Sequence, residues 1–595
     1  MVVKSKTLKP FSLYHTEHGR WILSFSISAL ILFCVFLFVK PVFMTIDDSR
    51  LKYIYAGYST GTPTSLYLFC YYPLSAIVST LYSLIPQVPW YALYQFGTIG
   101  FASGIIGKTI YKICYENKIP LPLSILFHIA YYISTCLIST VLMHFEITAA
   151  IIGSAGIACF VGIDTKRDSR KVRIIDYVIS SLCLIACFII QFNAFYSTAC
   201  YLLVAIAFKL FVGCKGNKKS FKSIAVLLAM LVVLIVGVKV QDKYLKRTDS
   251  WQEYLAYNKY RVSFWDYPHI TYEEDPELFE EMGWSEEFYN LTDSMYFMDR
   301  RFDKESLSSF TKPFSWFSYS DFDSLKANFH DQLSSLLHSE RLPIIQSCFL
   351  GFVLTWTIYL LLRRKWIVYR PQIIALLLDF FGTSILITVL AARGRLPLRA
   401  WLMALIPAVT VGVLLMLMTF KPRHSGRRMR GFALGGSIVL SVLVLIGGVW
   451  AIQKVIKKDM PWRIQRSDKV LLMEEYIIDH PENVYVYDHL GCQNYSVFAS
   501  YPDSESRPTN GFAWGSSYIY TPAYYEQLAY NNLDSLFTED FLRDNVYFIS
   551  GTENKLKYKT MLEAMLAKEY PGVVMEEVDT IDKAFVVFKV VKGVS

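Results

Sequence analysis

Two adjacent carboxylates, Asp47 and Asp48, directly follow the first long apolar segment of the chain, residues 21–44. An anionic side chain at the edge of a low-dielectric region costs free energy unless it is solvated or paired. One interpretation is structural, with both residues solvated and capping a helix that starts near Ser49. The other is chemical, with one of them acting as a general base at a membrane surface. The local sequence leaves both interpretations open.

Three arginines gather in a short segment between two later apolar segments. Residues 392–399 read Ala-Arg-Gly-Arg-Leu-Pro-Leu-Arg, which places arginines at Arg393, Arg395 and Arg399. Guanidinium groups bind phosphate oxygens bidentately, so the segment predicts a phosphate site at the membrane interface. The alternatives are contact with anionic lipid headgroups and ion pairs with an acidic external loop.

Other polar residues in or beside apolar segments are further candidates. His144 and Glu146 lie in a short turn. His144 could assist proton transfer and Glu146 could bind an acceptor or a metal ion, or both are ordinary polar residues at a helix end. Asp379 lies inside an apolar segment, where a carboxylate is by default a functional candidate, although it could instead pair with a neighbouring span.

A last group of candidates lies in the long polar segment after residue 241. It consists of Asn258, Arg261, Asp266 and Tyr267. These residues either line a cleft for an acceptor or hold the loop together.

The composition places all these residues in a multi-pass membrane protein. The 595 residues are 53% hydrophobic and 18% charged, with a mean hydropathy of +0.33. Soluble proteins average about 25% charged residues. Disorder and a disulfide scaffold are excluded, and ten of the eleven cysteines lie in or beside apolar segments. The net charge of +9 is carried by short loops, which is typical of membrane topology and not of nucleic-acid binding.

We expect about eleven transmembrane helices. They cover residues 21–44, 90–111, 120–142, 146–163, 174–192, 194–213, 223–241, 343–362, 371–391, 400–420 and 431–452. The loops 164–173, 209–222, 363–370 and 421–430 are rich in Lys and Arg. The positive-inside rule therefore predicts a cytoplasmic N-terminus and an external C-terminus in the cell membrane. The apolar segment 67–85 would invert this pattern, so we expect a re-entrant or interfacial helix there.

The predicted organisation has three parts: a cytoplasmic N-terminus (1–20), a transmembrane domain (21–452) and an extracytoplasmic α/β domain (453–595). The external loops 45–89, with interfacial helices, and 242–342 belong to the transmembrane domain. In the last domain we expect strands at 483–488, 545–550 and 584–591 and helices at 535–544 and 555–568.

The order of features in the first external loop resembles that of the GT-C membrane glycosyltransferases. A transmembrane helix is followed by the acidic pair, by a glycine-containing turn at residues 56–63, and by Tyr72-Pro73-Leu74. The match is closest to a group of uncharacterised bacterial multi-pass proteins with an Asp-Asp…Tyr-Pro-Leu pattern. The chain departs from many superfamily members because it lacks their His-Pro-Pro or Lys-Pro-Pro sequence, which leaves the type of donor open.

The same group carries an Arg-x-Pro-x-Arg sequence, which Arg395, Pro397 and Arg399 match. The resemblance implies a GT-C-like fold. It also implies transfer of a sugar from a polyprenyl-phosphate-linked donor to a cell-envelope glycan or lipid acceptor on the outer face of the membrane. Asp47 or Asp48 would take the proton of the acceptor hydroxyl, while the arginines would bind the donor phosphate. Such a single displacement inverts the anomeric centre.

The partners expected are the lipid-linked donor, the acceptor and membrane lipids, with no nucleic acid. No cofactor is certain, and a divalent metal ion is left open. One alternative function is a transporter or flippase of lipid-linked or anionic glycan precursors, which would need inverted repeats and polar residues near the bilayer midplane. Another is a non-catalytic envelope-assembly protein, in which the tyrosine-rich segment 518–530 is either a glycan-binding surface or a packed core.

Overall fold

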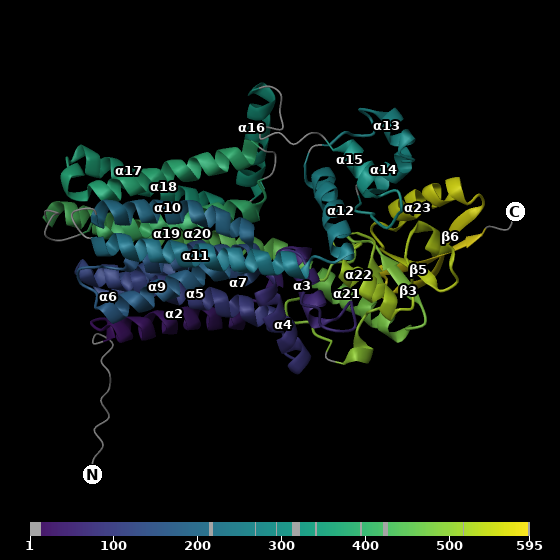
Figure 1. Ribbon diagram of the computed structural model, residues 1–595, viewed down its shortest axis with the longest axis horizontal. Coiled ribbons are helices and arrows are strands. Elements are labelled where there is room, and N and C mark those ends of the chain that lie inside the picture. Colours follow the sequence, from purple (N-terminus) through teal and green to yellow (C-terminus); the bar gives the residue numbers. More distant parts are fainter. Residues whose placement is uncertain are drawn as a thin grey trace, which may run out of the picture.

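The structure is a computed structural model. It describes residues 13–213, 218–267, 269–292, 294–311, 322–339, 342–392, 396–420, 427–501, 503–515 and 517–592. Long helices form a bundle, and a mixed α/β unit lies at one end of this bundle (Figure 1). Helix α2 (Glu17–Phe38) begins at the opposite end. The predicted fold class, a helical multi-pass protein with a C-terminal α/β domain, is confirmed in this architecture.

The bundle consists of helices that are apolar over most of their length. They are α2 (Glu17–Phe38), α5 (Trp90–Glu116), α6 (Leu121–Thr135), α7 (Leu137–Val141), α8 (Phe145–Gly162), α9 (Arg170–Ile190), α10 (Phe192–Gly213), α11 (Lys218–Leu245), α17 (Leu342–Leu362), α18 (Trp366–Ala392), α19 (Leu398–Met418) and α20 (Arg427–Lys454). Almost every residue of α8 and α19 is buried, whereas most of α2 and α11 is exposed. A helix that is apolar all round must be covered by neighbours or by lipid. Helices α8 and α19 are therefore the centre of the bundle.

Nine helices of the described residues are long and apolar enough to cross a membrane. Two other predicted spans, 90–111 and 120–142, coincide with α5, which carries Lys108 and Lys112, and with the short helices α6 and α7. A helix is present at each of the predicted positions, while the number that crosses the membrane stays a prediction.

The basic loop 164–173 lies at the end of the bundle where α2 begins. Lys112 Nζ lies 2.5 Å from Asp168 Oδ2, and Asn117 Nδ2 donates to the carbonyl of Leu417 at 2.7 Å. The hydroxyl of Tyr14 donates to a carbonyl of the loop between α5 and α6 at 3.0 Å. These contacts bring the loops that follow α5, α8 and α19 together, as the predicted topology requires.

A short parallel β-pair joins two segments at the other end of the bundle. Strand β1 (Val42–Phe43) follows α2, and strand β2 (Leu142–Met143) precedes α8. Val42 pairs with Leu142 and Phe43 with Met143. Because each strand leads directly into a helix, this pairing places the start of α3 (Ile46–Ala56) beside the start of α8.

The segment predicted as an interfacial helix forms α4 (Tyr72–Leu84), which begins five residues later than expected and has Pro73 in its first turn. The described residues of the segment 242–342, predicted to be an external loop, are folded. It contains α12 (Asp249–Asp266), α13 (Pro276–Glu281), α14 (Glu286–Thr292), α15 (Lys304–Phe310) and α16 (Phe322–Ser339). Trp284 is fully buried among the aromatic side chains of this segment, so the segment has a small core of its own.

The C-terminal unit is built on a five-stranded sheet of order β4-β3-β5-β7-β6. Its strands are β3 (Val484–Tyr487), β4 (Gly511–Ala513), β5 (Val546–Gly551), β6 (Val573–Ile581) and β7 (Phe585–Lys592). Strands β4, β3 and β5 are parallel, and β7 is antiparallel to both β5 and β6. The helices of this unit are α21 (Met460–Asp479), α22 (Pro522–Tyr530) and α23 (Lys555–Glu569).

One expectation about this unit needs correction. The predicted helix at 535–544 is wrong, because only Thr538–Leu542 form a short 3-10 helix, whose start is held by Asp540 accepting from the N–H of Phe537 at 2.7 Å. A second 3-10 helix covers Ser504–Ser506. The chain also has no helix end at residue 453, since α20 continues through a π-helical turn (Val455–Asp459) into α21. One unbroken helix, Leu434–Asp479, therefore links the bundle to the sheet.

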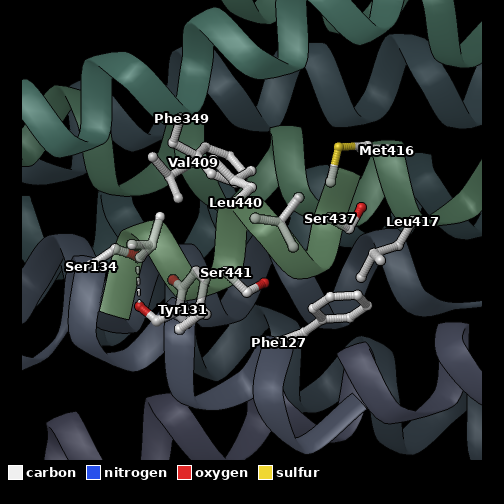
Figure 2. A pocket seen from close by; sticks show the side chains of 13 residues that line it. Phe127, Tyr131, Ser134, Phe349, Val409, Met416, Leu417, Ser437, Leu440 and Ser441 are labelled. Carbon is white, nitrogen blue, oxygen red and sulfur yellow. Dashed lines mark hydrogen bonds between the residues drawn. The ribbon is translucent and has the colours of Figure 1, made fainter. Parts of the chain in front are cut away.

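A small cavity lies inside the bundle between α6, α17, α19 and α20 (Figure 2). Its volume is about 40 Å³, and its walls are mostly apolar side chains such as Phe127, Phe349 and Met416. The hydroxyl of Tyr131, which also lines it, is hydrogen-bonded to Thr410 Oγ1 at 2.7 Å. A cavity of this size holds about one or two water molecules, so we interpret it as a packing gap.

Candidate active site

The first acidic residue, the last arginine and Glu146 meet at the end of the bundle nearest the sheet. Arg399 Nη1 lies 3.5 Å from Asp47 Oδ2, and Arg399 Nε lies 3.3 Å from Glu146 Oε2. Glu146 Oε1 also accepts a hydrogen bond of 3.0 Å from Gln191 Nε2. One guanidinium group therefore bridges two carboxylates that are far apart in the sequence.

Three helix starts bring these side chains together. Asp47, Glu146 and Arg399 each lie in the first turn of a helix, α3, α8 and α19 respectively. The β1–β2 pair holds the starts of α3 and α8 side by side, and α19 packs against α8. A carboxylate is favoured at a helix N-terminus and a cation is disfavoured there. Arg399 is thus stabilised in its position by the two carboxylates that it bridges.

Asp48 occupies a different environment from its neighbour Asp47. Its side chain is fully buried, and Oδ1 accepts hydrogen bonds from the hydroxyl of Tyr91 at 2.9 Å, from Gln95 Nε2 at 2.9 Å and from the N–H of Phe145 at 3.1 Å. These partners belong to α5 and α8, so Asp48 fastens α3 to the bundle. Asp48 does not cap the start of its helix, which begins at Ile46.

Burial raises the pKa of Asp48 well above its usual range, although the hydrogen bonds from Gln95 and Tyr91 oppose the shift. Among the described residues no partner contacts its second oxygen, Oδ2. Asp48 is therefore a buried carboxyl group whose hydrogen-bond partners all contact Oδ1. Asp47, by contrast, has a side chain that is 34% exposed and lies beside Arg399.

His144 makes its hydrogen bond to the backbone at the start of α8 and not to the side chains of the Asp47–Arg399–Glu146 cluster. It is the N-cap residue of α8, and its Nδ1 accepts from the N–H of Glu146 at 3.1 Å. Burial lowers the pKa of His144 well below its usual range, and the nearby Arg399 lowers it further. The imidazole is therefore neutral and acts here as a helix cap.

The structure adds a second guanidinium that the sequence interpretation did not include. Arg50 follows the acidic pair on α3, and its guanidinium carbon lies 5.0 Å from the ring centre of Tyr518. Burial acts to lower the pKa of Arg50, but the surrounding tyrosines Tyr487, Tyr67 and Tyr518 outweigh it and raise the pKa. The signal in the sequence was the spacing of Asp47 and Arg50, which places both on one face of a helix.

Arg261 and Asn258 are brought together on α12. Asn258 Oδ1 accepts from Arg261 Nε at 3.0 Å and from Arg261 Nη2 at 2.7 Å. Arg50 and Arg261 both act on buried His489, whose pKa is lowered to about 3, mainly by burial and further by these two charges. Burial raises the pKa of Tyr67 to about 12. The charge of Asp47 also raises this pKa, whereas the charges of Arg50 and Arg261 lower it. Guanidinium groups from α3 and α12 thus converge near Asp47.

The remaining predicted residues are less closely connected. Asp266, at the end of α12, raises the pKa of Arg399 together with Glu146 and Asp47, against the lowering effect of burial. Tyr267 directly follows α12, and its carbonyl lies 3.4 Å from a nitrogen of His269. Arg393 and Arg395 lie outside the described residues.

Asp379 is buried in α18, the helix that precedes the arginine-rich segment. Within the described ranges neither of its carboxyl oxygens has a hydrogen-bond partner, so the expected pairing with a neighbouring span is not observed there. The nearby hydroxyl of Tyr201 pairs with Thr383 Oγ1 at 3.0 Å. No group of three His, Cys, Asp or Glu side chains in the described part of the chain could hold a metal ion.

Comparison with known proteins gives matches only among solved structures. No protein-family model matches the chain. No curated protein sequence matches it either. The chain is similar to ArnT from Cupriavidus metallidurans bound to undecaprenyl phosphate, with 12% identity, a TM-score of 0.46 and coverage of 96% of this chain and 97% of ArnT. The apo state of the same ArnT gives 13% identity and a TM-score of 0.44, with the same coverage of both chains.

The chain is also similar to an oligosaccharyltransferase from Archaeoglobus fulgidus in the apo form. The identity is 13% and the TM-score 0.43, with coverage of 99% of this chain and 75% of the other. At these identities and TM-scores the likenesses carry no argument about what this chain does, and the function below is inferred from its own residues.

Proposed function

We propose that this protein is a glycosyltransferase that uses a lipid-phosphate-linked sugar. The observation that carries the proposal is the arrangement of Asp47, Arg399 and Glu146, in which a half-exposed carboxylate lies beside a guanidinium at the end of the membrane helices. A base next to a phosphate-binding group is what glycosyl transfer from a polyprenyl phosphate requires. The acceptor would be a cell-envelope glycan or lipid.

Asp47 is the better candidate for the general base. A base must reach the proton that it removes, so geometry comes first and pKa second. Asp47 is partly exposed, whereas Asp48 is fully buried and holds Tyr91 and Gln95. In the proposed step, the acceptor oxygen attacks the anomeric carbon and its proton passes to Asp47. The bond between that carbon and the phosphate oxygen breaks, the electron pair stays on the phosphate, and the anomeric centre inverts.

The departing phosphate would be bound by guanidinium groups. Arg399, Arg50 and Arg261 offer planar sets of N–H donors that match phosphate oxygens. The starts of α3, α8 and α19 add the positive ends of three helix dipoles to the same region. Donors fixed in advance near a developing negative charge lower the barrier without reorganising. Arg393 and Arg395 stay predictions for the same role.

The proposed orientation follows from charge. The basic loop 164–173 lies at the end of the bundle where α2 begins, opposite the candidate site. The positive-inside rule then places the N-terminus in the cytoplasm of the cell, and the candidate site and the α/β unit outside it. A donor whose sugar is presented on the outer face would reach Asp47 from the lipid.

The test compares Asp47→Asn with Asp48→Asn in cells that lack the natural gene. Envelope glycans are analysed by mass spectrometry after each variant is shown to insert at the wild-type level. We expect loss of one sugar substituent with Asp47→Asn, because general-base removal costs about 10²–10⁴-fold in rate. Asp48→Asn should keep the substituent, since an amide oxygen still accepts the three hydrogen bonds at Oδ1.

A full set of envelope sugars with Asp47→Asn would overturn the proposal. Loss of the substituent with Asp48→Asn and not with Asp47→Asn would move the role of base to Asp48. The matched pair differs by one residue position and by the same chemical change, so a general effect of lost acidity in this loop affects both variants alike.

A further inference from the structure

A large cleft lies outside the candidate active site, between the folded external loop and the C-terminal unit. Its volume is about 1030 Å³, near the upper end of the roughly 300–1,000 Å³ typical of ligand pockets. One wall comes from α12 and α15, and the other from the segment that contains Tyr520, Tyr525 and Phe537. The cleft exists only because the two external parts face each other.

Aromatic rings and carboxylates alternate along these walls. Tyr257 packs edge-on against Tyr520, with ring centres 5.1 Å apart, and Tyr525 is 47% exposed. The exposed carboxylates of Glu253 and Glu305 lie among these rings. Ring faces stack on the C–H faces of sugars, and carboxylates accept hydrogen bonds from sugar hydroxyls. A lipid chain would instead require an unbroken apolar surface.

The hydroxyl of Tyr257 is a second, independent indication of a ligand. Tyr257 is 6% exposed and lines the cleft, yet in the described structure its hydroxyl has no hydrogen-bond partner. A buried polar group without a partner costs free energy, so phenylalanine would be better at this position if packing were its only role. The hydroxyl oxygen itself is buried, so a hydroxyl of a bound molecule would supply the missing partner after a small shift of the side chains around it.

Helix α12 connects the cleft to the candidate active site. Tyr254 and Tyr257 line the cleft, whereas Asn258 holds Arg261 one turn further along the helix. The hydroxyl of Tyr254 donates to Asn258 Oδ1 at 3.2 Å, so the two sites share a hydrogen-bonded contact. One helical turn is about 5.4 Å, which is short compared with a sugar chain of several units.

We propose that this cleft binds the sugar chain of the acceptor and that Tyr525 and Tyr257 are its main contacts. The proposal rests on the glycosyltransferase function proposed above and names its acceptor class: an oligosaccharide or the glycan part of a larger acceptor. It also decides between the two interpretations of the tyrosine-rich segment. Tyr518 and Tyr524 are buried in the core, while Tyr525 is exposed in the cleft.

The test measures glycan binding and transfer separately. The probe is a set of short oligosaccharides released from the envelope of cells that lack the gene, because this glycan has not received the sugar. Binding to the full-length protein in detergent is measured by calorimetry without any donor. We expect Tyr525→Ala to weaken binding about three- to tenfold, as for the loss of one aromatic stacking contact. The matched control is Tyr530→Ala, which removes a tyrosine of similar exposure (51%) from the same helix outside the cleft.

Tyr257→Phe gives a readout that a purely structural role would not give. We expect weaker glycan binding with a melting temperature that is unchanged or higher, since the variant removes an unpartnered hydroxyl. In the transfer reaction, both cleft variants should raise the acceptor KM and leave the donor KM unchanged, whereas Asp47→Asn lowers kcat and leaves glycan binding intact.

Each outcome bears on one proposal or on both. If Tyr525→Ala, Tyr257→Phe and Tyr530→Ala all bind the glycan as tightly as the wild type does, the cleft proposal is overturned, even if transfer activity is found. Transfer without measurable glycan binding also overturns it and points to a lipid acceptor. Loss of transfer in Asp47→Asn together with unaltered cleft binding supports both proposals. Absence of both binding and transfer in the wild type overturns both.

Discussion

Ion pairs occur at both ends of the helical bundle, and the two ends differ in how tightly the charges are held. At the N-terminal end, Lys108 Nζ lies 2.7 Å from Asp176 Oδ1, and both side chains are 2% exposed. At the other end, Arg399 lies 3.5 Å and 3.3 Å from its two carboxylates and is 24% exposed. Residues of the same kinds therefore form a closed pair in one region and an open cluster in the other.

The difference separates an ion pair that is closed to solvent from a cluster that is partly open to it. A buried pair must satisfy its own charges, because no water reaches it. Lys108 does this with Asp176, with Glu17 at 3.7 Å and with the ring of Trp21. The side chains of the open cluster are partly exposed, with exposed fractions of 34% for Asp47 and 24% for Arg399. The length of an ion pair and its exposure thus tell more about function than its residue types do.

The largest expected effect comes from breaking the closed pair. Asp176→Asn should lower stability by about 3–5 kcal/mol, because it leaves the charge of Lys108 buried without its main partner. The measurement is the melting temperature in detergent at a fixed scan rate. Transfer activity per folded molecule should stay at the wild-type level, since Lys108 contacts Glu17 at the start of α2, at the end of the bundle remote from the candidate site.

The matched control replaces both partners. The double variant Lys108→Met/Asp176→Leu should recover most of the lost stability, because two apolar side chains replace two charges. A single variant as stable as the wild type would show that the closed pair contributes nothing. If Asp176→Asn folds normally but loses transfer, the closed pair would also be needed for activity, and the two regions would not differ in function.

Much of this architecture could be predicted from hydropathy, because a span that crosses lipid must be apolar for about 20 residues. The basic loops were also informative, since their charges are kept together at one end of the bundle. The C-terminal unit was harder. Helix α21 continues directly from α20, and no local signal marks a boundary at residue 453. The segment 535–544 has a helical composition, but the Asp540 side chain closes a short 3-10 turn there.

The candidate site was predicted in part. Asp47, Glu146 and Arg399 were singled out by residue type, and the structure brings these three together. Their contact depends on the two-residue pairing of β1 with β2, which is too short to leave a pattern in the sequence. The sequence also could not predict that Asp47 and Asp48 lie in different environments, because this depends on which face of α3 the bundle covers. Local sequence specifies a residue type, but burial is set by distant segments.

The next effect tests whether the open cluster needs a guanidinium. Arg399→Lys keeps the positive charge, but an ammonium is a compact point charge that cannot bridge Asp47 and Glu146 in the way a planar fork does. We expect transfer to fall about 10- to 100-fold, as for the loss of one charge-assisted hydrogen bond of about 1.5–3 kcal/mol. The measurement is the initial rate of transfer at saturating acceptor.

The matched control for this change is Arg466→Lys in the C-terminal unit, where Arg466 contacts Glu553 at 3.4 Å. This substitution should leave the rate unchanged. If Arg399→Lys keeps the full rate, charge alone is sufficient at that position. The closed pair and the open cluster would then differ in function because of their exposure and not because of their hydrogen-bond geometry.

The smallest effect concerns Lys52, a buried cation that belongs to neither kind of ion pair. Its Nζ donates to the carbonyls of Ser496 at 2.8 Å and Ala499 at 3.0 Å, and burial lowers its pKa to about 7, against the opposing charge of Glu474. Between that pH and the pKa of an unfolded lysine, the unfolded chain binds more protons than the folded one. Stability should therefore rise with pH above 7, by at most about 1.4 kcal/mol per pH unit.

The measurement is the melting temperature from pH 7 to pH 9 for the wild type, for Lys52→Met and for Lys40→Met, whose lysine is exposed. The wild type and Lys40→Met should gain stability with pH relative to Lys52→Met, because only Lys52 must lose its proton to be buried at low free energy. If the difference in melting temperature between the wild type and Lys52→Met is the same from pH 7 to pH 9, Lys52 stays charged in the folded protein. The carbonyls of Ser496 and Ala499 would then stabilise the buried charge of Lys52 as well as Asp176 stabilises that of Lys108. A buried lysine in this protein would then need no carboxylate as its partner.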